Sequence, residues 1–269
     1  MFFNRFNVNR GMWFGVVPLL TMGLVTTVLF AIGIIPLVYL WSSLIMWCLI
    51  SGLGIAVGYH RIFSHKTHVI PTWKENIILF FATLSGQGSC IFWVALHRGY
   101  HHPHADTAKD YHSPVAYSRW QAFMGWINSD TFNVVNLKYA VDLLKKPNFV
   151  FFHKYCYEIL WLTPAVIALY DWRLAMSMCF IPGMVGLLQD NAVNVFGHVK
   201  ALIGYRNFDT RDHSQNNFVL GYLGWGQGWH NNHHARPANF DFGRGTSGRW
   251  WEFDPCVIFL PVLGRSRRD

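Results

Sequence analysis

The chain has 269 residues, of which 52% are hydrophobic and 13% are charged, and its net charge is +8. Soluble domains carry about 25% charged residues, so this composition excludes an ordinary aqueous domain and indicates a membrane protein. The positive charge fits the positive-inside bias of such proteins, and no basic run interleaved with stacking aromatic residues suggests nucleic-acid binding. The five cysteines form no C-x-x-C pair, which argues against a disulfide framework and a rubredoxin-like or thioredoxin-like site.

Two uncharged segments open the chain. Residues 12–31 are long enough to cross about 30 Å of hydrocarbon as a helix, and residues 37–58 follow after a short turn. Arg5 and Arg10 precede the first segment, as in a signal peptide, but the apolar run is too long and lacks a convincing cleavage site. We therefore expect a hairpin of two membrane spans whose outer ends lie on the same side.

Residues 77–93 are also apolar, but the sequence Ser-Gly-Gln-Gly-Ser at 85–89 interrupts them. A crossing here would place His60 and His97 on opposite faces of the membrane, where they cannot share a site. We therefore expect an interfacial or re-entrant helix that does not cross.

Two further spans are predicted near the end of the chain. Residues 155–170 form the third, a polar turn at Asp171-Trp172-Arg173 follows, and residues 174–190 begin the fourth, which continues as helix to His198. Four spans place both termini on one side, and of the 22 Lys and Arg residues only Arg173 then lies on the other. This bias predicts that the termini and a cap made of residues 59–154 and 198–269 are cytosolic, within one membrane domain over residues 1–269.

Histidines gather in three boxes, and neutral imidazole is a common ligand for iron, zinc, copper and nickel. The first box is His60 with His65. On an α-helix five residues rotate through roughly 500°, so the two rings diverge by about 140°. They would hold one ion only at a bent helix end, or serve two ions.

The second box is His97, His101 and His102. We expect the first two to share a helical face, with His102 turned away and Pro103 ending the helix before His104.

The third box has i, i+3 and i+4 spacing on one face, in His230, His233 and His234. Asn194 and His198 add an i, i+4 pair at the end of the fourth span. The other histidines lack this spacing and are predicted not to be ligands: His68, His104, His112, His153 and His213.

A single histidine of this kind would as readily cap a helix or fill a core, but three boxes that fit on one face favour a metal centre. About nine histidines explain two ions better than one, because a structural zinc takes four ligands. The chain has no E-x-x-H pair of the carboxylate di-iron bundles.

With H-x-x-x-x-H, H-x-x-x-H-H and H-x-x-H-H in this order, the chain resembles the integral-membrane fatty acid desaturases, and among them the acyl-CoA, delta-9 (stearoyl-CoA) type. The resemblance covers residues 59–255. Further motifs carry it: Gln87-Gly88-Ser89, Trp93, Asp106-Thr107, Asp110, His112-Ser113-Pro114, Tyr205-Arg206-Asn207, Asp209-Thr210, Asn216-Asn217, Gly228-Trp229-His230-Asn231-Asn232-His233-His234, and 251–254.

The resemblance implies an all-α integral membrane fold, with four transmembrane helices and a cytosolic helical cap that holds a histidine-rich di-iron site. It implies that Asn194 binds one iron through water, and that there are no catalytic residues beyond the metal ligands. The implied ligands of the two irons are His60, His65, His97, His101, His102, His198, His230, His233 and His234.

The implied reaction is the O2-dependent insertion of a cis double bond into a long saturated acyl chain, carried by CoA or a lipid, at the delta-9 position. The chain has no flavin, haem or ferredoxin motif. We therefore expect electrons from a ferredoxin or a small cytochrome with its reductase, and a basic cytosolic face suits an acidic carrier.

Two positions depart from the usual pattern of this subfamily. Tyr100 lengthens the second box from H-x-x-H-H by one residue, and Gln227 stands where a Glu commonly precedes Gly-Trp-His. A membrane hydroxylase or ketolase would use the same site, and histidine spacing alone does not separate these activities. A histidine-rich metal transporter is a different alternative, but it would need polar residues inside the spans, and the first two spans carry no charge.

Overall fold

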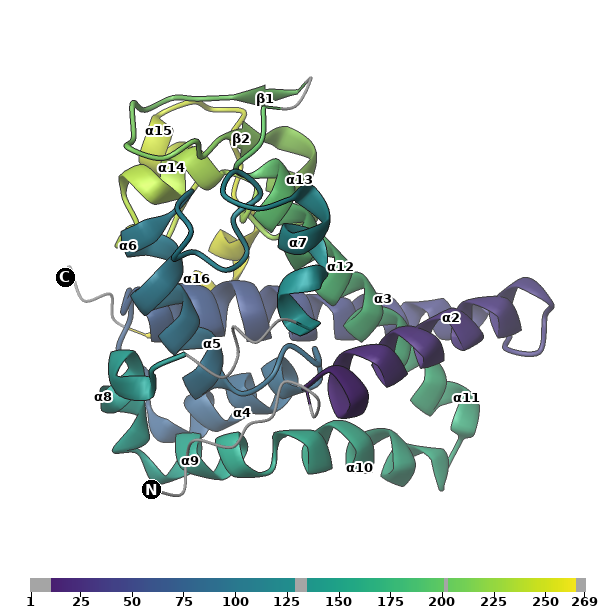
Figure 1. Cartoon of the computed structure of the whole chain (residues 1–269). Coiled ribbons are helices and arrows are strands. Elements are labelled where there is room, and N and C mark those ends of the chain that lie inside the picture. The colour runs from purple at the N-terminus through teal and green to yellow at the C-terminus, as the bar shows by residue number, and fades with distance from the viewer. Residues whose placement is uncertain (1–10, 129–134, 201–202, 265–269) are drawn as a thin grey trace.

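The computed structural model describes residues 11–128, 135–200 and 203–264 (Figure 1). Arg5 and Arg10 lie outside these ranges. The predicted all-α fold is confirmed for the described residues, apart from one antiparallel pair of short strands, β1 (Gly204–Tyr205) and β2 (Asn216–Asn217). In that pair Gly204 lies opposite Asn217 and Tyr205 opposite Asn216.

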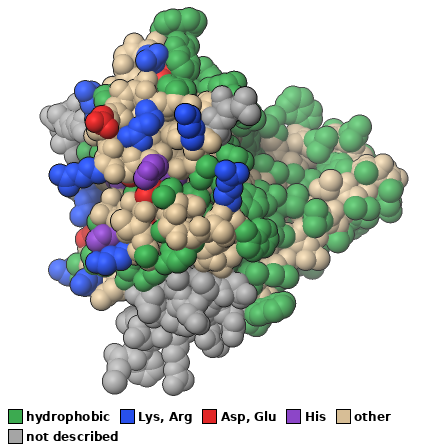
Figure 2. Space-filling model, turned by 45° about the horizontal axis from the view of Figure 1, so that its top comes forward, with side chains coloured by type: hydrophobic (Ala, Val, Ile, Leu, Met, Phe, Trp, Pro, Cys, Tyr) green, Lys and Arg blue, Asp and Glu red, His purple; other side chains and the backbone are tan. Residues whose placement is uncertain are grey.

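The first two helices form a hairpin that projects from the rest of the molecule (Figure 1). The first helix combines η1 (Gly11–Val16) with α2 (Val17–Ala31), and the second combines η2 (Leu37–Tyr39), α3 (Leu40–Trp47) and η3 (Cys48–Ser64). Within the described residues, these two helices are long and apolar enough to cross a membrane. The second runs six residues beyond the predicted end at 58, so that it carries His60 itself. We call this hairpin, residues 11–64, the arm. Large apolar side chains such as Trp41 are exposed along it, which suits contact with lipid (Figure 2).

The predicted interruption of residues 77–93 is confirmed. Helix α4 (Thr72–Thr83) ends before it and α5 (Cys90–Leu96) begins after it. Gly86 and Gly88 adopt positive φ angles of 70° and 85°, which glycine reaches without steric cost. Ser89 then caps α5, because its hydroxyl accepts a hydrogen bond from the backbone N–H of Phe92.

Helices η3 and α4 pack closely because two glycines of η3 lie against α4. A Cβ at Gly58 would lie 2.1 Å from Ile78 Cγ2, and one at Gly54 would lie 2.7 Å from the backbone nitrogen of Ala82. The absence of a side chain at these two glycines therefore sets how near the interrupted segment comes to the helix that carries His60.

The predicted third span corresponds to α10 (Cys156–Ala168), a short apolar helix that follows α9 (Pro147–Lys154). The predicted fourth corresponds to a continuous helix made of α11 (Trp172–Ala175), η8 (Met176–Phe180) and α12 (Ile181–Phe196). It ends two residues before His198, close to the predicted end. That α10 and this helix cross the membrane stays a prediction, as does the single domain over residues 1–269.

The cap consists of short helices around the end of η3, most of them above it and α8 below it in the view of Figure 1. A buried ion pair fastens it to the arm, since Arg61 Nη2 on η3 lies 2.7 Å from Asp254 Oδ2 and both side chains are fully buried. The Arg61 guanidinium also donates to the Ala56 and Phe240 carbonyls and stacks over the Phe242 ring, so its charge is hydrogen-bonded and well packed. The short helices are η4 (His97–His101), α6 (His102–His104), α7 (Arg119–Phe123), η5 (Gly125–Asn128), η7 (Leu137–Ala140), α8 (Val141–Leu144), α13 (Phe218–Leu223), α14 (His230–Ala235), α15 (Arg244–Ser247), η9 (Pro255–Phe259) and α16 (Leu260–Leu263).

The expected helix end before His104 is wrong. Helix continues through Pro103 to His104, because Pro103 lies in the first turn of α6. The helical segment that begins at Cys90 nevertheless ends one residue after Pro103, because a proline lacks the N–H that would bond to the preceding turn.

Candidate metal centre

The first histidine box lies on a π-helical segment. The backbone N–H of His65 donates to the carbonyl of His60 at 3.1 Å, a bond that spans five residues. Such a bond brings residues i and i+5 to the same side of the helix, whereas an α-helix separates them. The ring centroids of His60 and His65 are therefore only 5.0 Å apart, and the expected divergence of about 140° does not occur.

The second box repeats this device in η4. The backbone N–H of His102 donates to the carbonyl of His97, and the two ring centroids lie 4.6 Å apart. His97 thus pairs with His102, and His101 joins other histidines, so the expected pairing of His97 with His101 is wrong. The reason is the π-helical turn, which replaces the α-helical periodicity that the expectation assumed.

The third box divides as well. His230 and His234, one α-helical turn apart on α14, have ring centroids 4.4 Å apart. His233 turns to the rings of the first box, with its Nε2 atom 2.9 Å from that of His60. One face for all three histidines was expected, but the box contributes to two neighbouring groups.

These pairings assemble two groups of histidines, and every predicted ligand histidine belongs to one of them. The five-histidine group consists of His60, His65, His97, His102 and His233. The four-histidine group consists of His101, His198, His230 and His234. Within each group the candidate ligand atoms all lie within 4.8 Å of one another.

The donor atoms suit a metal ion. Each of the nine histidines has its Nε2 atom within 3.2 Å of the Nε2 atom of another, so the ring nitrogens converge as the ligands of a metal ion do. Burial lowers the pKa of His65 to about 3 and that of His234 to about 4, which keeps these rings neutral at pH 7, as metal ligation requires. Imidazole sets of this kind suit iron, zinc or copper.

Three aspartates stand behind the four-histidine group. Asp110 Oδ2 lies 3.0 Å from His101 Nδ1, Asp106 Oδ2 lies 3.2 Å from His198 Nδ1, and Asp212 Oδ2 lies 2.6 Å from His234 Nδ1. Burial acts to lower the pKa of His101, but Asp110 reverses this and raises it. Sequence reasoning counted Asp106 and Asp110 among the motifs of the resemblance but assigned them no role, and it did not single out Asp212.

The histidines predicted not to be ligands mostly lie elsewhere. Ser89 Oγ lies 2.5 Å from His153 Nδ1, the ring of His213 is largely exposed, and His68 and His104 belong to neither group. His112 differs, because it is buried and its Nδ1 lies 3.2 Å from Asp110 Oδ1, in a third possible cluster with His101. That these five are not ligands stays a prediction.

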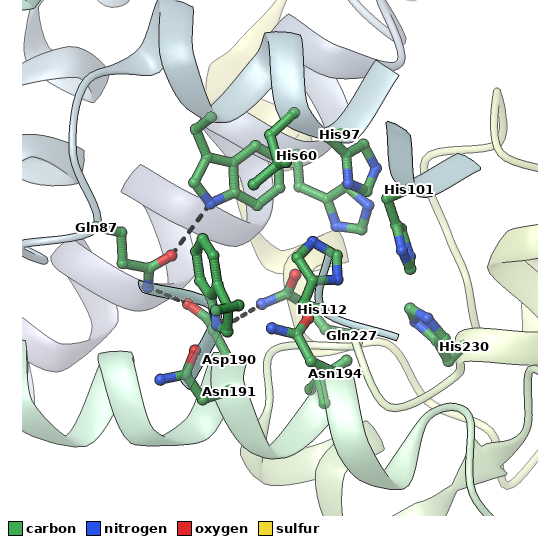
Figure 3. A pocket seen from close by; sticks show the side chains of 14 residues that line it. His60, Gln87, His97, His101, His112, Asp190, Asn191, Asn194, Gln227 and His230 are labelled. Carbon is green, nitrogen blue, oxygen red and sulfur yellow. Dashed lines mark hydrogen bonds between the residues drawn. The ribbon is translucent and has the colours of Figure 1, made fainter. Parts of the chain in front are cut away.

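A cavity opens beside both groups, lined by His60 and His97 on one side and by His101 and His230 on the other (Figure 3). Asn194, the predicted ligand through water, also lines it.

Asp190 lies in the cavity wall and joins two amides: one carboxylate oxygen accepts from Gln87 Nε2 and the other from Gln227 Nε2 (Figure 3). Gln87 Oε1 in turn accepts from Trp93 Nε1 at 3.1 Å. This network was not predicted from the sequence.

A second cavity, lined mainly by apolar side chains such as Val16 and Leu187, lies next to the first. The two cavities share Gln87 and Trp126 in their walls. The first cavity contains the histidines and the second is mainly apolar, an arrangement that suits a long apolar ligand with its reacting carbons near the metal groups.

Known proteins resemble this chain over most of its length. The sequence profile of the family described as Fatty acid desaturase matches residues 34–253. The probable lipid desaturase ADS3.2, chloroplastic, of Arabidopsis thaliana is 32% identical over 244 residues, which cover 85% of this chain and 64% of that protein. The sn-1 stearoyl-lipid 9-desaturase of Anabaena variabilis is 30% identical over 258 residues (90% and 89%), and the sn-2 palmitoyl-lipid 9-desaturase of a Nostoc strain is 32% identical over 253 residues (87% and 83%). The chain therefore belongs to the fatty acid desaturase family, and it is an oxidoreductase whose family implies an acyl substrate and a metal cofactor.

Proposed function

We propose that the chain is a membrane desaturase that uses O2 to insert a cis double bond at the ninth carbon of a saturated acyl chain. The observation that carries this proposal is the convergence of nine histidine Nε2 atoms, in two adjacent groups, beside a cavity that adjoins a mainly apolar one. Two irons would be held by the five-histidine and four-histidine groups, with Asn194 binding one of them through water. When bound, the iron pair supplies the oxidant that unactivated C–H bonds require, since no side chain is a strong enough base to remove such a hydrogen.

The chain's own residues position the substrate. Asp190 and its two glutamines brace the cavity wall beside the histidines, and the apolar cavity receives the far end of the acyl chain. Holding two chosen carbons at the metal groups makes the reaction effectively unimolecular, which lowers the entropic part of its barrier. The apolar lining also keeps water from the reacting carbons.

The acyl group is carried by a lipid in this proposal, with acyl-CoA as the alternative. Two of the relatives are named stearoyl-lipid and palmitoyl-lipid 9-desaturases, and these names support both the lipid carrier and the ninth carbon. The exposed apolar arm supports a substrate that reaches the cavity from the bilayer.

In the membrane, the helices around 12–31, 37–58, 155–170 and 174–190 cross the bilayer and the cap faces the cytosol. Lys and Arg side chains gather on the cap face (Figure 2). They would dock an acidic ferredoxin, or a small cytochrome with its reductase, as the electron donor.

A test is to express the chain, with such a donor, in a host rich in saturated acyl chains. Gas chromatography with mass spectrometry should find new monounsaturated chains with the double bond at the ninth carbon, and the His233→Ala variant should produce none. Hydroxylated chains would instead favour the hydroxylase alternative. Unchanged lipids from an iron-loaded protein with a working donor would overturn both.

A further inference from the structure

The two histidine groups have different surroundings. In the four-histidine group, three of the four rings place Nδ1 within 3.2 Å of a carboxylate oxygen, of Asp106, Asp110 or Asp212. In the five-histidine group, no Asp or Glu of residues 11–128, 135–200 and 203–264 forms an ion pair with any ring.

Aromatic rings surround the five-histidine group instead. Trp93 stacks on His97 with ring centroids 5.0 Å apart, and Phe242 packs on His233 at 4.1 Å. Nδ1 of His60 and Nδ1 of His233 have no hydrogen-bond partner among the described residues. The neutral amide of Gln227 lines the cavity together with His60, at the position where a Glu commonly occurs in this family.

The three carboxylates are themselves held in place. Asp212 accepts hydrogen bonds from the Thr210 hydroxyl at 2.7 Å and from the backbone N–H of Ser214 at 3.0 Å. Asp106 has a φ of 64°, a left-handed conformation that aspartate adopts more readily than most residues other than glycine. This backbone conformation places the Asp106 carboxylate 3.2 Å from His198 Nδ1.

A carboxylate on Nδ1 has two effects on a ligand histidine. It fixes the proton on Nδ1, which leaves the Nε2 lone pair for the metal, and it raises the basicity of the ring. It also places a negative charge near the ion, and the attraction between the two is strong in a buried site. Three such carboxylates therefore act on one metal position and not on the other.

From this asymmetry we propose that the chain holds two unequal metal positions, and that Asp106, Asp110 and Asp212 are positioning residues for the four-histidine position alone. The inference rests on the proposed function, because it assumes that both groups hold iron. Removing one of these carboxylates weakens iron binding at the four-histidine position by about 10- to 100-fold and leaves the five-histidine position filled.

The wild-type protein, purified with iron-57, provides the first test. Metal analysis should find two irons per chain, and the Mössbauer spectrum of the ferrous protein should contain two quadrupole doublets of equal area. A graded series of chelators should remove the irons in two phases, one doublet at a time. Loss of both irons in a single phase, or one doublet for both, would overturn the inference.

Single-residue variants show which Mössbauer doublet belongs to which histidine group. Asp212→Asn and Asp110→Asn, which keep the shape of the side chain, should each lose the same one of the two doublets at a chelator strength that the wild type resists. His65→Ala should lose the other doublet. Asp209→Asn removes an equal charge from an exposed position in the same loop as Asp212, and it should behave like the wild type. Asp212→Glu should restore part of the lost affinity, which a purely structural defect would not predict.

The outcomes of these experiments distinguish a failure of the unequal metal positions from a failure of the proposed di-iron function. Aspartate variants that lose both irons equally, or neither, overturn the unequal positions while desaturation by the wild type still stands. A folded wild-type protein that binds fewer than two irons overturns the di-iron proposal itself, and the inference with it.

Discussion

At the scale of the residue, the neighbours of a histidine ring separate the predicted ligands from the predicted non-ligands, whereas burial alone does not, since His68 and His153 are buried as well. His97 is 8% exposed, and its Nε2 atom lies 2.8 Å from that of His65. His104, at the end of the same helical segment, belongs to neither histidine group. The number of histidines in the boxes predicted which rings would gather, but the division into groups depends on backbone turns that residue types do not reveal.

His97→Ala should abolish desaturation and lower iron content, because the loss of one ligand both weakens the five-histidine group and opens it to water. His104→Ala should keep its iron and most of its activity. Iron analysis of the two purified variants decides this: full iron in His97→Ala together with loss in His104→Ala would show that the central box is misassigned.

Asp190→Asn tests the cavity wall. The carboxylate accepts from two amide donors, and an asparagine offers one oxygen and one N–H2 group, so one glutamine loses its acceptor. A buried donor without a partner costs about 1–3 kcal/mol, and the wall should relax. We expect a mixture of double-bond positions with unchanged iron content, measured by mass spectrometry of derivatised fatty acids. The control is Val185→Ala, an exposed position on the same helix; a single unchanged product from Asp190→Asn would contradict the role.

At the scale of the element, the sequence predicted which segments are helical but not their pitch. The uncharged runs placed the hairpin, and the two glycines of 85–89 placed the break between α4 and α5, because both features follow from residue chemistry. The π-helical turns at His65 and His102 do not, since a backbone bond from i+5 to i leaves no mark in composition. For this reason, the sequence alone predicted that histidine rings five residues apart in the first two boxes would point in different directions.

The π-helical turn at His102 explains how the second box accommodates Tyr100, its extra residue. On an α-helix, H-x-x-H-H brings residue i together with i+4; in this chain an extra residue and a π-helical turn bring His97 together with His102. Deletion of Tyr100 should allow the turn to become α-helical and keep that pair intact. We expect the deletion variant to bind more iron than His97→Ala does, although its contacts with Tyr111 and Tyr139 are lost. Iron content equal to or below that of His97→Ala would contradict this account.

At the scale of the whole molecule, the hairpin of residues 11–64 has its tip at one end and the histidine groups near the other. The tip of the hairpin lies beside the turn between α10 and α11. A hydrogen bond joins them, in which the hydroxyl of Tyr39, close to the tip, donates to Asp171. The histidine groups lie at the opposite end of η3. At 1.5 Å per residue, the helix from Leu37 to His60 is at most about 35 Å long, comparable with the hydrocarbon thickness of a bilayer.

This arrangement predicts which residues face the same side of the membrane. Cysteines placed at Lys66 and Lys109, which are exposed in the cap, should react with an impermeant maleimide only from the cytosolic side. Cysteines at Ile34 and Tyr170, exposed at the other end, should react only from the opposite side. The native background is low, because Cys90, Cys156, Cys179 and Cys256 are buried and Cys48 is half-buried. Labelling of positions 66 and 109 from opposite sides would mean that residues 77–93 cross the bilayer, and the two histidine groups would then have no common side from which to receive electrons.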